Sequence, residues 1–208
     1  MSKAILIQQV YTGSPYSELL AFQFGRNLNY CKAHDMDYSV NYGNIVEQWK
    51  LEYGGWAKTA LIWGALNKYE HVIWLDVDTL IADLSADLRD GCPAFGIGMT
   101  LHNPAHPVYN VGAMYVTNSE EVRAFIYEWM GWYPGPIGGW YEQAMINLLI
   151  QIPKFSNMVT PIDYKWNSTR AANIHVDNAV VEGFHGEGDY ARRLQLMKEF
   201  LHNANIPA

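Results

Sequence analysis

The chain has 208 residues, which suits one large α/β domain. Its 14 Lys and Arg residues face 21 Asp and Glu residues, so the net charge is −7, and no basic block marks a nucleic-acid partner. With 50% hydrophobic and 17% charged residues the chain can bury a core, which excludes intrinsic disorder, and two cysteines are too few for a disulfide framework. No run reaches about 18 apolar residues, and the N-terminal run 4–10 is too short for a secretory signal, so we expect a cytoplasmic protein without a membrane span.

The first 35 residues predict a strand followed by a helix. The strand covers residues 4–10 (AILIQQV), and Ser14 and Pro15 suit the N-cap and the first position of the helix. The helix is expected to end near residues 34–35 and to bury one stripe made of Leu20, Phe24, Leu28 and Cys31.

The next segment predicts a strand over 37–41, a helix over 56–68 and a strand over 71–75. The strand 71–75 (HVIWL) is apolar throughout, without alternation, which is typical of a parallel strand covered on both faces.

Further strands are expected over 94–99 and 111–116. Asn118 and Glu121 form a capping-box pattern that opens a helix to about residue 130. Residues 132–140 (WYPGPIGGW) break regular structure, before a helix over 141–151 and a strand over 158–162. The predicted fold class is therefore α/β, a single Rossmann-like domain with a mostly parallel twisted sheet and helices on both faces.

An acidic pair, Asp76 and Asp78, follows the apolar strand 71–75. Open α/β sheets bind ligands at this carboxyl end of their strands. Residues i and i+2 of an extended chain point to the same side, so both carboxylates would converge on one hard cation and the phosphate oxygens that it binds. The alternative is a pair of solvated turn residues.

The segment 56–81 (WAKTALIWGALNKYEHVIWLDVDTLI) resembles the nucleotide-sugar site of GT-A glycosyltransferases, and it is most similar to the retaining glycogenin-like and the galactosyl- and xylosyltransferase families. Three further motifs follow in the order of those families: Tyr109–Gly112 (N-x-G), Glu142-Gln143 with Asn147 (D-Q-x-x-x-N), and His185 with Gly188 (H-x-x-G). The chain also resembles glycosyltransferase domains encoded by large algal viruses, which would place it in a host cytoplasm.

The resemblance implies a UDP-sugar donor, a saccharide or glycan acceptor, and a Mn²⁺ or Mg²⁺ ion. Two carboxylates and an imidazole suit Mn²⁺ better than they suit Mg²⁺. By the resemblance, the ion is held by Asp76, Asp78 and His185, and Lys58 faces the phosphates or the transferred sugar. The remaining implied donor-site residues are Gln9, Val10 and Tyr11 around uracil and ribose, Tyr16 stacked on uracil, and Leu75, Val77 and Gly188.

Two positions depart from the family pattern. Glu142 stands where Asp is usual, and the Lys-Pro-Trp that often follows H-x-x-G is replaced by residues 191–193 (Ala-Arg-Arg). Arg192 or Arg193 would then contact the diphosphate.

The acceptor is expected to bind mainly in the second half of the chain, about 116–208, whereas the nucleotide is expected in the first half, about 1–115. Trp132 and Trp140 would stack on a pyranose, although they also suit a structural corner. The other expected acceptor-site residues are Asn110, Gly112 and Trp166. Asp163 and Glu142 are the acids outside the metal pair that we place near the cleft. Neither has the setting of a base, so retention is expected, with Gln143 helping to position the acceptor.

Other functions compete with this interpretation. His102 and His106 have the spacing of a zinc helix, but Pro104 lies between them, so we expect loop residues instead. A haloacid-dehalogenase-type phosphatase also uses an Asp pair after a strand, but Thr79 lies one residue too early for that pattern. A lectin-like module would use the 8 Trp and 14 Tyr without turnover. The sequence does not predict the oligomeric state.

Overall fold

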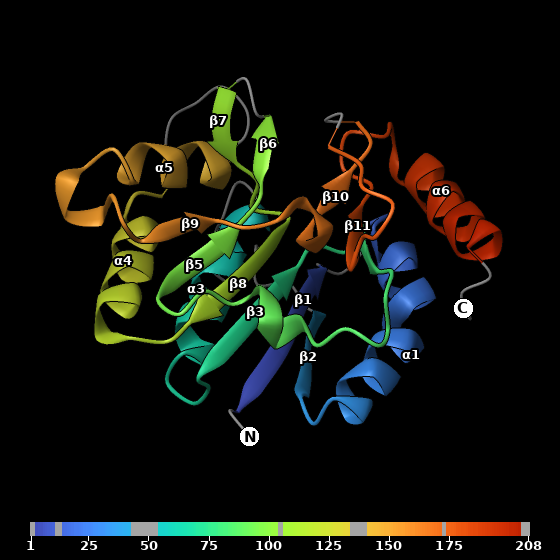
Figure 1. Ribbon diagram of the computed structural model, residues 1–208, viewed down its shortest axis with the longest axis horizontal. Helices are drawn as coiled ribbons and strands as arrows, with labels where there is room; N and C mark the ends of the chain where they lie inside the picture. The colour runs from blue at the N-terminus through green and yellow to red at the C-terminus, as the bar shows by residue number, and fades with distance from the viewer. Residues whose placement is uncertain are drawn as a thin grey trace.

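A six-stranded sheet forms the centre of the protein (Figure 1), in the order β2-β1-β3-β8-β5-β9. The structure is a computed structural model that describes residues 3–10, 14–42, 54–103, 106–133, 141–171 and 174–204. β1 pairs in parallel with β2 and β3, and β5 with β9, whereas β8 is antiparallel to β3 and β5. The predicted α/β class with a mostly parallel sheet is confirmed. The strands are β1 (Ala4–Val10), β2 (Asp37–Tyr42), β3 (His71–Leu75), β5 (Gly96–Met99), β8 (Ala113–Thr117) and β9 (Val159–Pro161).

Helices cover both faces of this sheet, as Figure 1 shows. Ile5 and Ile7 of β1 pack in a core with helices α3, α4 and α5, while Leu6 faces the other way and packs with Tyr30 of α1. In the described part of the chain, no helix has both the length and the apolarity to cross a bilayer. The helices are α1 (Ser17–Ala33), α3 (Ala57–Ala65), α4 (Glu120–Gly131), α5 (Tyr141–Leu149) and α6 (Tyr190–Asn203), with short 3-10 turns η1 (Gly54–Trp56), η2 (Leu88–Gly91), η3 (Pro153–Phe155) and η4 (Tyr164–Trp166).

The strand β3 has the predicted bounds and is buried from Val72 to Leu75. It lies between β1 and β8, with α3 on one side and the core around Tyr30 on the other. The continuous apolarity of this strand is therefore explained by burial on both faces.

A small three-stranded sheet, β10-β11-β4, was not predicted. β4 (Thr79–Ile81) follows the acidic pair directly and is antiparallel to β11 (Val181–Gly183), which is parallel to β10 (Ser168–Thr169). This sheet brings the C-terminal part of the chain to the end of β3. The helix α6 was not predicted either.

The helix α1 differs from the prediction in its start and in its buried face. It begins at Ser17 with Tyr16 as the N-cap residue, and the Ser14 hydroxyl accepts a hydrogen bond from the Tyr16 N–H (3.2 Å) in the preceding turn. Phe24 of the predicted apolar stripe is 44% exposed, whereas the polar Gln23 and Asn27 are fully buried. These two side chains hydrogen-bond to one another and to Gln8, so the buried face of α1 contains a polar network that a search for apolar residues misses.

Two smaller expectations also need correction. His102 and His106 lie in a hairpin of β6 (Leu101–Asn103) and β7 (His106–Tyr109), not in an irregular loop. The N-cap of α4 is Ser119, whose hydroxyl accepts a hydrogen bond from the Val122 N–H (3.2 Å). Asn118 instead donates to backbone carbonyls after α3, so it ties α3 to α4.

Candidate functional site

A cavity of about 300 Å³ opens at the carboxyl ends of β1 and β3, where α/β sheets bind ligands. The structure brings together many of the residues that the sequence predicted for one site. Its lining comprises the predicted Gln9, Val10, Tyr16, Lys58, Asp76, Val77, Asp78 and Glu142, the alternative Arg193, and the unpredicted Ser14, Gly55 and Trp74.

Asp76 and Asp78 reach this cavity from a turn, not from an extended chain. The Thr79 N–H donates to the Asp76 carbonyl (3.0 Å), which closes the turn between β3 and β4. The Asp76 N–H donates to the Gly112 carbonyl (2.8 Å), and the Asp78 carbonyl accepts from the Phe184 N–H (2.8 Å). The expected extended geometry is therefore wrong, although both carboxylates line the same cavity.

Lys58 is a buried cation between two carboxylates. Its side chain is 3% exposed, and its Nζ lies 3.2 Å from Asp76 Oδ1 and 3.1 Å from Glu142 Oε1. It also donates to the Val111 carbonyl (3.3 Å), and the Trp74 indole N–H donates to Asp76 Oδ1 (2.7 Å). Burial by itself lowers the pKa of Lys58, but Asp76 and Glu142 outweigh burial and raise this pKa above its ordinary value. Lys58 therefore stays charged at neutral pH.

The other cation in the cavity lining is Arg193, on the first turn of α6. One guanidinium nitrogen lies 2.5 Å from Asp78 Oδ2, and the Arg193 Nε–H donates to the Gly188 carbonyl (3.1 Å). The guanidinium carbon lies 5.5 Å from the centre of the Tyr16 ring. Arg192 is exposed, so the structure brings Arg193 and not Arg192 to the cavity.

His185 joins the N-x-G motif beside the cavity. The Asn110 Oδ1 accepts from the Gly112 N–H (2.7 Å), which turns the Asn110 amide N–H₂ toward His185 Nε2 at 2.7 Å. Thr169 Oγ1 lies 3.0 Å from the same nitrogen. A Cβ atom at Gly183 would lie 2.5 Å from the imidazole, so this position requires glycine unless the ring shifts, and a Cβ atom at Gly112 would make a tight contact of 3.3 Å with the same ring. Two motifs far apart in the sequence thus form one polar cluster.

His185, the predicted third metal ligand, is not among the residues that line the cavity of the acidic pair. Within the described residues, no three His, Cys, Asp or Glu side chains gather closely enough to hold a metal ion. His185 Nε2 contacts Asn110 and Thr169, while Nδ1 is buried without a hydrogen-bond partner in the described part of the chain.

Residues of α5 hold the segment after β7. Gln143 Oε1 accepts from the Val111 N–H (3.2 Å). Asn147 accepts from the Tyr109 N–H (2.8 Å) and donates to the Tyr109 carbonyl (3.2 Å). Gln143, predicted to position the acceptor, is thus engaged with the backbone and does not line the cavity.

Three predicted site residues have structural positions instead. Trp166 is 6% exposed and packs against Tyr115 with ring centres 5.5 Å apart, so its ring offers no stacking surface. Asp163 caps η4 by accepting from the Lys165 N–H (2.8 Å), outside the cavity lining. Leu75 is fully buried in the core beneath the acidic pair.

The predicted acceptor loop is described only in part. Trp132 is 48% exposed at the end of α4, and its indole N–H donates to Glu128 (3.2 Å). Its stacking role stays a prediction. Trp140 and Tyr11, the latter predicted for the donor site, lie outside the described residues.

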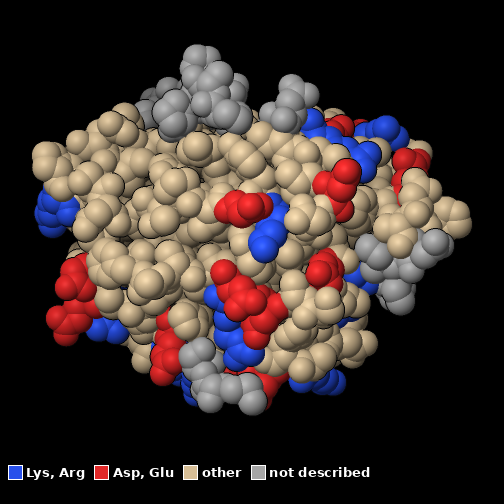
Figure 2. Space-filling model, viewed as in Figure 1, with Lys and Arg blue, Asp and Glu red and all other residues tan. Residues whose placement is uncertain are grey.

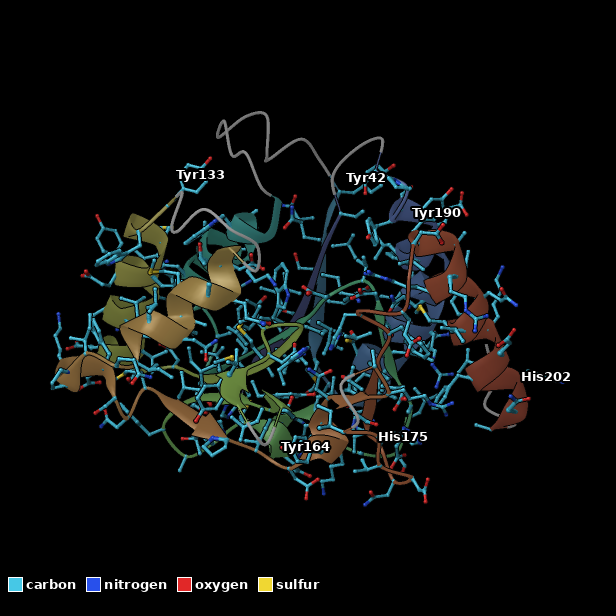
Figure 3. The ribbon with its side chains drawn as sticks, turned by 90° about the horizontal axis from the view of Figure 1, so that it is seen from above. Tyr42, Tyr133, Tyr164, His175, Tyr190 and His202 are labelled. Carbon is cyan, nitrogen blue, oxygen red and sulfur yellow. The ribbon has the colours of Figure 1, made fainter. Side chains whose placement is uncertain are left out.

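A second cavity, of about 790 Å³, lies between β11 and α6. Figure 3 shows His175, which lines this cavity, at the edge of the molecule opposite Tyr42 and Tyr190. Glu182 is fully buried there, with Oε1 3.2 Å from His175 Nδ1 and 3.5 Å from Arg170 Nε, and Oε2 has no hydrogen-bond partner among the described residues. Burial raises the pKa of Glu182, and Ser168, His175 and Arg170 offset this only in part.

We expect Glu182→Gln to stabilise the protein at neutral pH. A carboxyl whose pKa is raised by folding contributes stability below its unfolded value of 4.5 and loses it as the pH rises through the folded value. Glutamine does not ionise, so the variant does not lose this stability as the pH rises. Its melting temperature at pH 7 should exceed that of the wild type by about 2–4 °C for each kcal/mol of unfolding free energy gained. The difference should vanish below about pH 4. Thermal unfolding across pH measures this, with the exposed Glu70→Gln as the control; a variant that is less stable at pH 7 would contradict it.

Comparisons with known proteins support the fold. No family model matches the sequence, and no curated protein is significantly similar to it. Among solved structures, the chain is similar to a glycosyltransferase involved in the glycosylation of the major capsid of PBCV-1, with 15% identity, a TM-score of 0.75, and 95% of this chain and 99% of that chain covered. It is also similar to the glycosyltransferase GlyE of Streptococcus pneumoniae TIGR4 (12% identity, TM-score 0.58, 100% and 65% covered) and to the bifunctional glycosyltransferase WbbM (12%, 0.56, 99% and 50%). The chain therefore has the fold of these glycosyltransferases and spans about half of WbbM.

Proposed function

We propose that this protein is a glycosyltransferase of the GT-A type that moves a sugar from a UDP-sugar to a saccharide hydroxyl. The observation that carries the proposal is the cavity at the ends of β1 and β3, where Asp76, Asp78 and Lys58 meet the ring of Tyr16. The carboxylate pair of the cavity suits a divalent cation, and the basic side chains suit a diphosphate. The aromatic ring suits stacking on a nucleobase. On the face seen in Figure 2, acidic and basic side chains are interspersed, so nothing there favours a nucleic-acid partner.

The residues of the cavity support distinct roles toward the donor. Tyr16 would stack on the uracil, and Gln9 and Val10 at the end of β1 would contact the nucleoside. Lys58 is held by Asp76 and Glu142 in a fixed, charged position, so it is preorganised to stabilise negative charge on the leaving diphosphate.

The acidic pair fits a divalent cation. Both carboxylates lie on one turn and line one cavity, and carboxylate oxygens are preferred ligands of Mg²⁺ and Mn²⁺. When bound, the cation would supply Lewis-acid stabilisation of the departing diphosphate, worth several kcal/mol. Asp76 and Asp78 would hold it, and His185 stays a predicted third ligand.

Calorimetric titration with UDP, with and without Mn²⁺, tests the proposal. We expect UDP to bind in a Mn²⁺-dependent manner and Asp78→Asn to abolish that dependence. A protein that binds saccharides but no UDP would be a lectin-like module. No observation on the fold or the cavity favours that alternative or the phosphatase.

His185→Ala tests the third ligand. We expect the variant to raise the Mn²⁺ concentration needed for half-maximal UDP binding, because one of three protein ligands is lost. Thr169→Val removes a partner of the same imidazole without removing the ring and serves as the control. An unchanged Mn²⁺ requirement in His185→Ala would leave His185 a purely structural partner of Asn110.

The transfer should retain the anomeric configuration. An inverting enzyme needs a carboxylate base at the acceptor hydroxyl. Glu142 is already paired with Lys58 at 3.1 Å, and Asp163 caps η4 outside the cavity lining, so neither supports that role. NMR of the anomeric proton of the product, compared with that of the donor, measures the outcome. Inversion of the anomeric configuration would contradict this prediction, and Glu142 and Asp163 would then be the candidate bases.

A further inference from the structure

Arg193 contacts two parts of the proposed donor site, the carboxylate of Asp78 and the ring of Tyr16. The Asp78 side chain is 9% exposed and the Arg193 side chain 17%, so water screens the pair only weakly. The guanidinium lies on Asp78 Oδ2, and it also lies 5.5 Å from the ring centre of Tyr16. Arg193 therefore contacts both the carboxylate proposed to bind the cation and the ring proposed to stack on the uracil.

The charges of the cavity lining are already paired. Its acids are Asp76, Asp78 and Glu142, and its bases are Lys58 and Arg193. Lys58 is shared by Asp76 and Glu142, while Arg193 neutralises Asp78. A divalent cation that enters alone competes with Arg193 for Asp78, and a guanidinium that it displaces lacks an anion. A nucleoside diphosphate that enters alone meets three carboxylates and two cations that are already engaged.

When both ligands enter together, each group gains a partner. The cation takes Asp78, and the diphosphate supplies oxygens that match a guanidinium in charge and geometry. We propose that Arg193 is a positioning residue that makes cation and nucleotide binding depend on each other, by moving from Asp78 to the donor diphosphate. This inference rests on the proposed function.

The start of α6 permits this exchange by side-chain movement alone. Asp189 caps the helix by accepting from the Arg192 N–H (2.9 Å), and Gly188 has a positive φ of 78° that sets the turn before the cap. The helix buries Met197 and Leu201 against the core. The backbone of α6 is therefore held, while the long Arg193 side chain has room in the cavity to change partners.

The proposal predicts effects of opposite sign in Arg193→Gln. Mn²⁺ alone should bind more tightly than to the wild type, because no guanidinium competes for Asp78. UDP in the presence of Mn²⁺ should bind about tenfold or more weakly, because a charge-assisted hydrogen bond to the diphosphate is lost. In the wild type, each ligand is expected to raise the affinity for the other by about 5- to 150-fold. In Arg193→Gln this factor should fall toward one.

Two measurements on the full chain test this. The loss of the free Mn²⁺ signal in electron paramagnetic resonance gives the affinity for Mn²⁺ alone, and calorimetry gives the affinity for UDP with and without Mn²⁺. Arg193→Lys keeps the charge and should restore part of the coupling. Lys198→Gln removes an exposed cation from the same helix and should change neither affinity. Melting temperatures show whether each variant is folded.

The outcomes separate this inference from the proposed function. Tighter Mn²⁺ binding together with weaker UDP binding in Arg193→Gln supports it. Two affinities that fall together, or that stay unchanged, overturn it while the proposed function stands. A wild-type protein that binds no UDP with Mn²⁺ overturns the proposed function, and the inference with it.

Discussion

Replacing Asp78 with asparagine is expected to lower the rate of sugar transfer by at least about a hundredfold, because it weakens the proposed hold on the cation that would stabilise the charge of the leaving diphosphate. Asp78 is a proposed cation ligand, and asparagine keeps its shape without its charge. The side chain is 9% exposed and paired with Arg193, so the variant also leaves a guanidinium without its anion. The measurement is the rate of UDP release from UDP-sugars with Mn²⁺ present.

The fold should survive this change. The backbone carbonyl of Asp78, which accepts from the Phe184 N–H, is unaffected by the substitution. Asp90→Asn, at an exposed position away from the cavity, is the control and should keep full activity. An Asp78→Asn variant that transfers sugar at the wild-type rate would show that the site is misplaced.

Replacing Lys58 with methionine is expected to abolish transfer and to destabilise the fold by about 3–5 kcal/mol, because removing one partner of a buried ion pair leaves uncompensated charge. Here the charges left behind are those of Asp76 and Glu142. Since folding raises the pKa of Lys58, its stabilising contribution is present below the unfolded value of 10.5 and is lost only as the pH rises through the folded value. Denaturant unfolding at pH 7 measures the effect.

A second variant separates stability from catalysis. Lys58→Met combined with Glu142→Gln removes one of the two stranded carboxylates, so part of the lost stability should return while transfer stays absent. The control is Lys68→Met, at an exposed position just after α3, which should change neither quantity. If the double variant regains activity along with stability, Lys58 is a structural residue only.

Much of the cavity at the ends of β1 and β3 was predictable because its residues sit at the ends of elements with strong local signals. Lys58 lies at the start of α3, and Asp76 and Asp78 follow β3, whose apolar run fits only a strand buried on both faces. The meeting of Lys58 with the acidic pair was implied by the resemblance of 56–81 to glycosyltransferase sequences, and not by the order of the elements. The turn that carries the acidic pair was not predictable, because it depends on the pairing of β4 with β11.

Burial was where local patterns failed. Trp166 has a large aromatic ring of the kind that binds sugars, yet in the structure this ring packs against Tyr115. Phe24 fits an apolar stripe, yet it is exposed because Gln23 and Asn27 take the buried face and hydrogen-bond with Gln8. A pattern of residue types records what can be buried, and the packing of distant elements decides what is buried.

The sequence by itself determined the α/β class, the strand β3 and the place of the acidic pair, because each depends on contacts within a few residues or on the periodicity of one element. Only the tertiary structure decided that Arg193, 115 residues away, pairs with Asp78, and that His185 binds Asn110 across 75 residues. Both contacts depend on the two- and three-residue strands of the β10-β11-β4 sheet. Strands of this length are too short to show a period, and they form because the larger fold brings their backbone hydrogen-bonding groups together.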